Sequence, residues 1–284
     1  MTDEQQVQSA RSLADAYAIL AERDDMRIIA GGTDLMVLMN ARLLDARHFL
    51  DIWGLDELRG ITDQGPTLRI GALTTFADLS RSALVLHHMP SLAAASRTVG
   101  AAQIQNRATI GGNIVNASPA GDSLPVLAAY DAEVEAGSLL GIRRIRFTDF
   151  YKGYRRTVLR SDELVLALCI PKLAHGERDY FRKVGTRRAQ AISKAVMASR
   201  ARVSDGRIER IAIGIGSVAP TVIRASRTES FLNGSQVDSS VIETAREIIA
   251  GEVQPITDLR STEAYRRAVT ANLLAGFLRQ LIST

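Results

Sequence analysis

The chain has 284 residues, of which 46% are hydrophobic and 23% are charged, so it can bury a substantial core and is not a disordered protein. Its net charge is +4, and aromatic residues make up only 5%. Its basic clusters lack the interleaved aromatic residues of single-strand binders, so we expect no nucleic-acid partner. The single cysteine, Cys169, excludes an intramolecular disulfide and a cysteine-ligated iron–sulfur cluster.

No export or membrane signal is visible in the sequence. The first residues are polar and acidic, and the longest aliphatic run, 164–170, is far shorter than the roughly 20 residues that span a bilayer. We therefore expect a cytoplasmic protein without a membrane span.

The first segment, about residues 1–58, predicts a small α/β unit. Ser12 with Asp15 three positions later forms a capping-box pattern ahead of an amphipathic helix. Short strands are predicted at 26–30 and 47–52, and a glycine pair interrupts the chain directly after the first of them.

A turn-rich junction at 60–66 begins a second segment, about residues 59–175. It predicts a helix capped by Thr75 and another that begins near Pro90. Strands are predicted at 67–73, 132–137, 142–150 and 163–171.

A third segment, residues 176–284, places its strands before its helices. Strands are predicted at 178–185, 195–203 and 208–218, with an Asp-Gly hairpin turn at 205–206. Amphipathic helices follow at 239–253 and 262–283. This order predicts an α+β module with a three-stranded antiparallel sheet and helices.

Motifs for catalysis by the chain's own side chains are absent, and we predict no catalytic residue and no metal ligand. The four histidines have no acidic or cysteine neighbours at ligand spacing. The stretch "GIGSVA", 214–219, fits a dinucleotide fingerprint only in its letters, because Pro220 and β-branched residues follow where a helix must begin. We predict a strand end or a turn there.

Two glycine pairs carry more information, "AGGTD" at 30–34 and "TIGGN" at 109–113. A glycine pair lets consecutive N–H groups form an anion-binding concavity, and short polar residues beside it can bond phosphate or ribose oxygens. Two such loops suit a ligand with two phosphates. Each pair taken singly is also compatible with an ordinary turn.

Four separated motifs resemble one known family. "IIAGGTDLM", "TIGGNIVNASPAGDSLP", "DELVLALCIP" and "YFRKVGTRRAQAIS" look like the FAD-binding medium subunit of molybdenum hydroxylases of the xanthine dehydrogenase and carbon monoxide dehydrogenase type. The resemblance covers essentially the whole chain. It implies a two-subdomain, PCMH-type FAD-binding domain at 1–175, with subdomains about 1–58 and 59–175, and a C-terminal flavoprotein domain at 176–284.

The resemblance also implies which residues bind FAD. The first glycine loop matches the family's loop around the FAD pyrophosphate, and the second loop meets the same ligand from the other side. Asp122 matches an acid near the adenosine. Val165 matches a position beside the isoalloxazine ring, and Lys183 matches a lysine near the reactive end of that ring. The implied set is Arg27, Ile28, Ile29, Ala30, Gly31, Gly32, Thr33, Asp34, Thr109, Gly111, Gly112, Asn113, Asn116, Asp122, Val165 and Lys183. From the residues alone, Asp122 also fits a turn cap, Val165 a core position and Lys183 a surface charge.

The function that the resemblance implies is electron transfer. Substrate is oxidised at a molybdopterin cofactor on a large partner subunit, electrons pass through two [2Fe-2S] clusters on a small one, and FAD on this chain delivers them to an acceptor, in a dimer of heterotrimers. Two alternatives remain from other classes: a stand-alone FAD oxidase, and a non-enzymatic module that binds another diphosphate.

Overall fold

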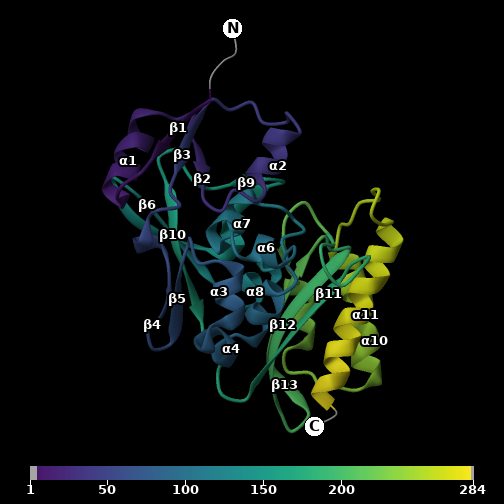
Figure 1. The fold of residues 1–284 in the computed structure, drawn as a ribbon. Coiled ribbons are helices and arrows are strands. Elements are labelled where there is room, and N and C mark those ends of the chain that lie inside the picture. The colour runs from purple at the N-terminus through teal and green to yellow at the C-terminus, as the bar shows by residue number, and fades with distance from the viewer. Residues whose placement is uncertain (1–4, 283–284) are drawn as a thin grey trace.

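The first layer of the protein is a three-stranded parallel sheet at the N-terminal end (Figure 1). The computed structural model describes residues 5–282. The sheet order is β1-β3-β2, and the elements of this layer are β1 (Gln6–Ser9), α1 (Leu13–Glu22), β2 (Arg27–Ile29), α2 (Leu35–Asn40) and β3 (His48–Asp51). Ser12 caps α1 as predicted, but the Asp15 carboxylate accepts from the Arg11 N–H, so only half of the predicted capping box forms.

A five-stranded antiparallel sheet forms the centre of the molecule. Its order is β4 (Ile61–Asp63), β5 (Thr67–Gly71), β10 (Leu164–Pro171), β6 (Glu133–Ser138) and β7 (Gly141–Arg146). The central strand β10 is apolar throughout because both of its faces are buried: Leu164 and Leu166 pack on the N-terminal layer, and Leu168 packs on the opposite side. A bulge between Val165 and Ala167 shifts the register of β10, so that residues before and after it pack against different layers.

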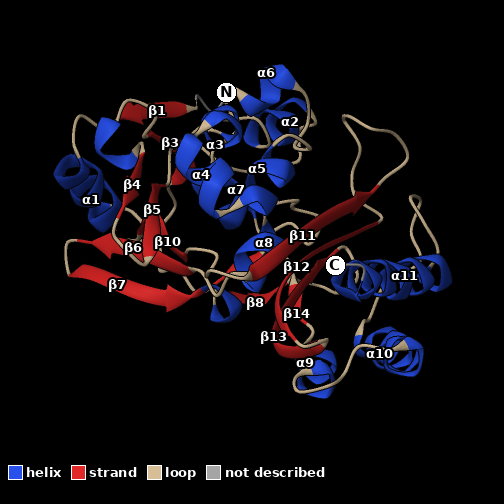
Figure 2. Cartoon of the chain, turned by 90° about the horizontal axis from the view of Figure 1, so that it is seen from below, coloured by secondary structure: helices blue, strands red, loops and turns tan. Residues whose placement is uncertain are grey.

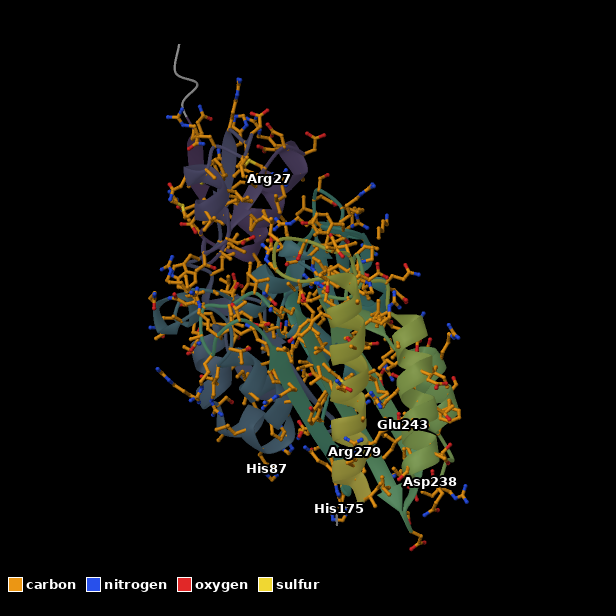
Figure 3. All side chains as sticks on the ribbon, turned by 90° about the vertical axis from the view of Figure 1, so that its right-hand side faces the viewer. Arg27, His87, His175, Asp238, Glu243 and Arg279 are labelled. Atoms are coloured by element: carbon orange, nitrogen blue, oxygen red, sulfur yellow. The ribbon has the colours of Figure 1, made fainter. Side chains whose placement is uncertain are left out.

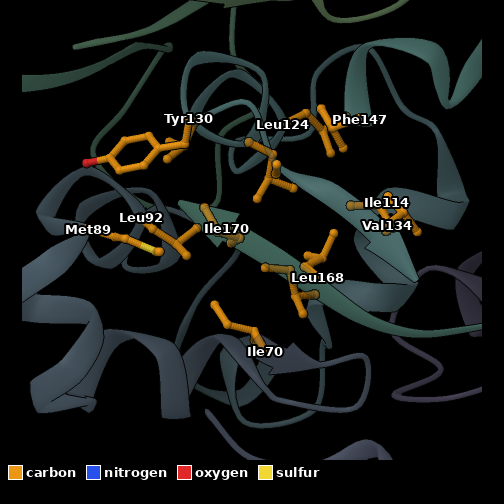
Figure 4. Packing of buried hydrophobic residues seen from close by; sticks show 14 of the residues in the cluster. Ile70, Met89, Leu92, Ile114, Leu124, Tyr130, Val134, Phe147, Leu168 and Ile170 are labelled. Atoms are coloured by element: carbon orange, nitrogen blue, oxygen red, sulfur yellow. The ribbon is translucent and has the colours of Figure 1, made fainter. Parts of the chain in front are cut away.

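Short helices cover the second face of this sheet. They are α3 (Phe76–Arg81), α4 (Ala83–His88), α5 (Pro90–Ser96), α6 (Ala102–Gln105), α7 (Ile110–Asn116) and α8 (Leu124–Ala129). Ile70 and Leu168 of the sheet meet Leu92 and Leu124 of the helices in the main core (Figure 4). The predicted cap is present: Thr75 and Asp78 form a complete capping box at α3. Two 3-10 turns, η1 (Asp56–Leu58) and η2 (Phe147–Asp149), and a small hairpin, β8 (Tyr151–Gly153) and β9 (Arg156–Thr157), complete this part.

The C-terminal part is an antiparallel sheet between two layers of helices (Figure 2). Its elements are β11 (Glu177–Val184), β12 (Ala195–Ser204), β13 (Arg207–Gly216), β14 (Ile223–Arg224), α9 (Ser226–Leu232), α10 (Ser239–Glu252) and α11 (Glu263–Ile282). The predicted α+β class is confirmed, and the sheet has a fourth strand because β14, two residues long, pairs with β13. The predicted hairpin turn is present, with φ of 51° at Asp205 and 72° at Gly206.

The glycines at 214–216, which mimic a dinucleotide fingerprint, belong to the end of strand β13. A Cβ added to Gly214 would lie 2.0 Å from the Pro125 carbonyl oxygen, so the glycine lets β13 approach the backbone of α8. The stretch "GIGSVA" therefore serves packing between the central helices and the C-terminal sheet. It lies at the end of β13 and in the bend that follows, as predicted. Within residues 5–282, no helix is both long enough and apolar enough to cross a membrane.

Candidate functional site

The first glycine segment follows the edge strand β2 and leaves a run of backbone donors unused. The Ile52 N–H donates to the Ile29 carbonyl, and this bond ends the ladder between β2 and β3. From Ala30 to Asp34, no backbone N–H has an acceptor among residues 5–282. Gly32 takes the left-handed conformation with φ of 74°, a backbone conformation that is found in anion-binding nests. This segment, the amide run 30–34, has the donors that an anion requires.

The two glycine segments touch each other although they are far apart in sequence. A Cβ added to Gly31 would lie 1.9 Å from the Arg107 carbonyl oxygen, so Gly31 packs against the backbone just before Thr109. Any larger residue at position 31 would force the two segments apart. Gly31 is therefore required by the close approach of the chain to itself.

The second glycine segment is a helix, which differs from the predicted loop. Thr109 caps α7, and the N–H groups at positions 110 to 113 all have partners: Thr74 O, Ala72 O, Thr109 Oγ1 and Thr109 O in that order. The prediction that Gly111 and Gly112 offer bare N–H donors is therefore wrong. Neither glycine takes positive φ, because both continue the first turn of α7.

Gly111 and Gly112 lack a side chain for different reasons. A Cβ on Gly111 would lie 2.7 Å from Ala72 Cβ, so packing within the protein requires this glycine. A Cβ on Gly112 would meet only the Thr109 hydroxyl, at 3.0 Å, and the residue is exposed. Gly112 thus leaves bare backbone at the surface that a ligand can approach.

The two asparagines of α7 extend this surface towards the next segment. Asn113 Oδ1 accepts from Ser123 Oγ at 2.7 Å, and Asn116 Oδ1 lies 3.4 Å from the Arg155 guanidinium. The Ser123 bond connects α7 to the turn that holds Asp122.

Asp122 and Lys183 form a buried ion pair between the central and C-terminal parts. Lys183 Nζ lies 2.5 Å from Asp122 Oδ2 and also donates to the Thr98 carbonyl at 3.0 Å. The side chains are only 7% and 11% exposed. Burial raises the pKa of Asp122 to about 6, although Lys183 pulls in the opposite direction. Asp122 Oδ1 is buried without a hydrogen-bond partner among the described residues.

This pair changes two expectations. The surface-charge interpretation of Lys183 is wrong, because the side chain is buried in contact with a carboxylate. Two residues in direct contact also cannot mark the adenosine end and the flavin end of one extended ligand, so the two assignments cannot both hold. Thr98, which bonds both members of the pair, has no signal in the sequence that would have identified it.

The remaining candidate residues lie in β2 and in the main core. Arg27, Ile28 and Ile29 form β2, which leads into the amide run 30–34. Val165 is 6% exposed and belongs to the core cluster that contains Ile114 of α7. Arg27 lies in the upper part of the molecule in Figure 3, far from His87 in the lower part. No group of three or more metal-ligating side chains occurs in the described residues.

These features fit a dinucleotide such as FAD. The amide run 30–34 offers unused donors, and Gly112 leaves backbone bare where packing within the protein does not require a glycine. Asp122 keeps one buried oxygen without a hydrogen-bond partner within residues 5–282. Contacts from Gly31 to Arg107, along α7 to Asn113, and from Ser123 to the Asp122 pair connect these features into one path.

Comparison with known sequences identifies two matching families. Residues 3–173 match the FAD binding domain in molybdopterin dehydrogenase, and residues 180–281 match the CO dehydrogenase flavoprotein C-terminal domain. The chain is 33% identical over 260 residues to the putative xanthine dehydrogenase FAD-binding subunit XdhB of Escherichia coli K12, covering 90% of this chain and 89% of that protein. It is 32% identical over 260 residues to the glyceraldehyde dehydrogenase medium chain of Sulfolobus acidocaldarius, covering 92% of each.

Solved structures show the same fold. Carbon monoxide dehydrogenase from Hydrogenophaga pseudoflava superposes with a TM-score of 0.93 at 29% identity, covering 96% of this chain and 95% of that one. The family matches span nearly all of the described chain, and the relatives are dehydrogenase subunits. The chain therefore belongs to the family of FAD-binding medium subunits of the xanthine dehydrogenase and carbon monoxide dehydrogenase type, and it is part of an oxidoreductase.

Proposed function

We propose that this chain is the electron-transfer subunit of a molybdenum-containing hydroxylase, taking electrons from [2Fe-2S] centres on a partner and passing them through FAD to an external acceptor. The observation that carries the proposal is the amide run 30–34, whose unused donors lie against the segment that leads to Gly112. The chain also matches more than 90% of the length of a carbon monoxide dehydrogenase medium chain and of the medium subunit of nicotine 6-hydroxylase.

The chain's own residues would hold the cofactor. The N–H groups of the amide run and the Thr33 hydroxyl would bind the diphosphate, and Gly112 would let it approach α7. The Asp122 and Lys183 pair would border the same path where the C-terminal sheet covers it, with Asn113, Asn116 and Val165 alongside. When bound, FAD supplies a carrier that exchanges electrons with both single-electron centres and two-electron acceptors.

The partners follow from the family. A large molybdenum-cofactor subunit and a small subunit with two [2Fe-2S] clusters would complete the complex, as a dimer of heterotrimers. The one cysteine of this chain cannot ligate such a cluster, which supports their location on another chain. We also propose that residues 1–175 hold the FAD and that residues 176–284 form the covering domain.

Co-purification tests this function. We expect a tagged chain, expressed with the genes beside its own, to bring down a molybdopterin protein and a small iron–sulfur protein. A flavin-free complex made with Gly112→Val should keep its metal centres but lose substrate-driven reduction of the acceptor. A chain that purifies alone and oxidises a substrate by itself would support the stand-alone oxidase instead.

A further inference from the structure

Trp53 is the only tryptophan of the sequence, and two arginines lie over its ring. The Cζ atoms of Arg107 and Arg59 are 3.8 and 4.4 Å from the ring centroid. These distances are well within the range of a cation–π interaction. Trp53 follows β3, and its backbone N–H donates to the Asp51 carboxylate at 2.9 Å.

The two arginines differ in what their guanidinium groups do. Arg59 donates to the carbonyl oxygens of Trp53 and Leu73, at 2.6 and 3.2 Å, so its donors serve the fold. Among residues 5–282, the Arg107 guanidinium has no hydrogen-bond acceptor and no acidic partner. Arg107 is exposed, and its guanidinium stacks on Trp53 without a hydrogen bond to any other described residue.

The position of Arg107 places this charge at the amide run 30–34. Its own carbonyl packs against Gly31, so its backbone touches the run directly. Trp53 and Gly31 follow the carboxyl ends of the adjacent parallel strands β3 and β2. The ring and the guanidinium therefore lie at the same edge of the sheet as the unused N–H donors, where ligands of such sheets bind.

We propose that Arg107 is a further contact for the diphosphate of FAD, and that Trp53 is the positioning residue that holds its guanidinium. The inference rests on the proposed cofactor site at the amide run. A guanidinium suits this role because its planar fork donates two hydrogen bonds to one phosphate, and stacking on an aromatic ring leaves its edge donors free.

Titration of the flavin-free full chain with FAD, followed by flavin fluorescence, tests the proposal. We expect Arg107→Gln to weaken binding roughly ten- to hundredfold and to flatten its dependence on salt, since one charge-assisted contact is lost. Trp53→Leu should weaken binding roughly two- to tenfold, and Trp53→Phe should restore most of the loss because an aromatic face remains. The double variant Trp53→Leu with Arg107→Gln should bind no more weakly than Arg107→Gln alone.

Two further variants serve as controls. Arg107→Lys keeps the charge but loses the fork, so its affinity should fall between those of the wild type and Arg107→Gln. Arg227→Gln removes an exposed arginine on α9 and should leave binding and its salt dependence unchanged. Wild-type affinity and salt dependence in Arg107→Gln would overturn the proposal while the FAD site stands. Additive losses in the double variant would overturn the role of Trp53, and a wild-type chain that takes up no FAD would overturn the cofactor site itself.

Discussion

Of the four glycines in the two pairs, Gly112 is the one whose missing side chain the fold itself does not require. Gly31 and Gly111 each face another part of the chain so closely that a Cβ has no room, whereas a Cβ on Gly112 would point to open space apart from the Thr109 hydroxyl. A glycine in a helix costs roughly 1 kcal/mol relative to alanine. A ligand that approaches the backbone of α7 gives a reason for this cost.

Gly112→Val should abolish FAD binding while the protein stays folded. The branched side chain would occupy the surface that the diphosphate must reach, but it would displace little of the protein. The flavin-to-protein absorbance ratio and a thermal melt check both parts. Gly251→Val is a control, because Gly251 also lies in a helix and has no atom within 4 Å of its Cβ position. Unchanged flavin content in Gly112→Val would contradict the assignment.

The Asp122 carboxyl should make stability depend on pH. Its folded pKa of about 6 lies above the ordinary value of 3.8, so between these values the folded state binds a proton that the unfolded state has released. The contribution of Asp122 to the free energy of unfolding is therefore fully present below pH 3.8 and is lost as pH rises through about 6. The loss is about 3 kcal/mol, at about 1.4 kcal/mol per pKa unit.

Asp122→Asn removes this titration and serves as the reference. Urea unfolding of the flavin-free wild type and variant at several pH values from 4 to 7 measures the difference between them. We expect the wild type to lose stability relative to Asp122→Asn as pH rises. A difference that stays constant, or that changes in the other direction, would show that the carboxyl does not titrate near pH 6.

At the scale of single residues, the sequence predicts which positions lie at the site, but it predicts less well what each residue does there. The letters at 31–34 and 109–113 predicted two neighbouring segments at one site, and Gly31 does touch Arg107. The ion pair of Asp122 with Lys183 could not be predicted, because it joins residues 61 positions apart in different parts of the molecule. Nor does sequence spacing indicate that Arg107 stacks on Trp53.

Helix α7 shows how tertiary packing overrides local preference. Two glycines and two asparagines in seven residues favour a loop, which is what the sequence predicts here. The segment is helical because Ile110 and Ile114, one turn apart, are both fully buried in the main core, and because Thr109 caps the helix. Elements with clear periodicity or turn chemistry, such as α10, α11 and the hairpin between β12 and β13, were predictable from the sequence.

Thr109→Val should destabilise the protein by about 1 kcal/mol, because it removes the hydroxyl that accepts from the Gly112 N–H while keeping a similar shape. Urea unfolding measures the loss, and Thr109→Ser should retain the bond and most of the stability. Equal stabilities of Thr109→Val and the wild type would show that the cap contributes nothing.

For the whole molecule, the turn after α8 holds the central part against the C-terminal sheet. The Asp131 carboxylate accepts from Arg200 at 2.7 Å, Arg224 at 2.5 Å and Arg210 at 3.1 Å, which come from three strands of that sheet. Burial alone would raise the pKa of Asp131, but Arg224 and Arg200 keep it below its ordinary value. The cluster fixes the relation between the two parts that enclose the proposed cofactor path.

Asp131→Asn should lower stability by about 1–2 kcal/mol, since it leaves arginines without their charge partner while the partly exposed site admits water. Asparagine also tolerates the left-handed backbone at this position, where φ is 54°. Thermal unfolding measures the loss. Asp149→Asn, in an exposed pair with Arg146, is the control and should change stability little. Equal effects of both variants would contradict a special role for Asp131.

The central claim concerns what the chain binds, and the flavin content of the purified full chain tests it most directly. The account predicts a yellow protein with equimolar FAD, released as intact dinucleotide on denaturation, whose isolated chain oxidises no substrate. A folded chain that purifies without colour and takes up no added FAD would contradict it.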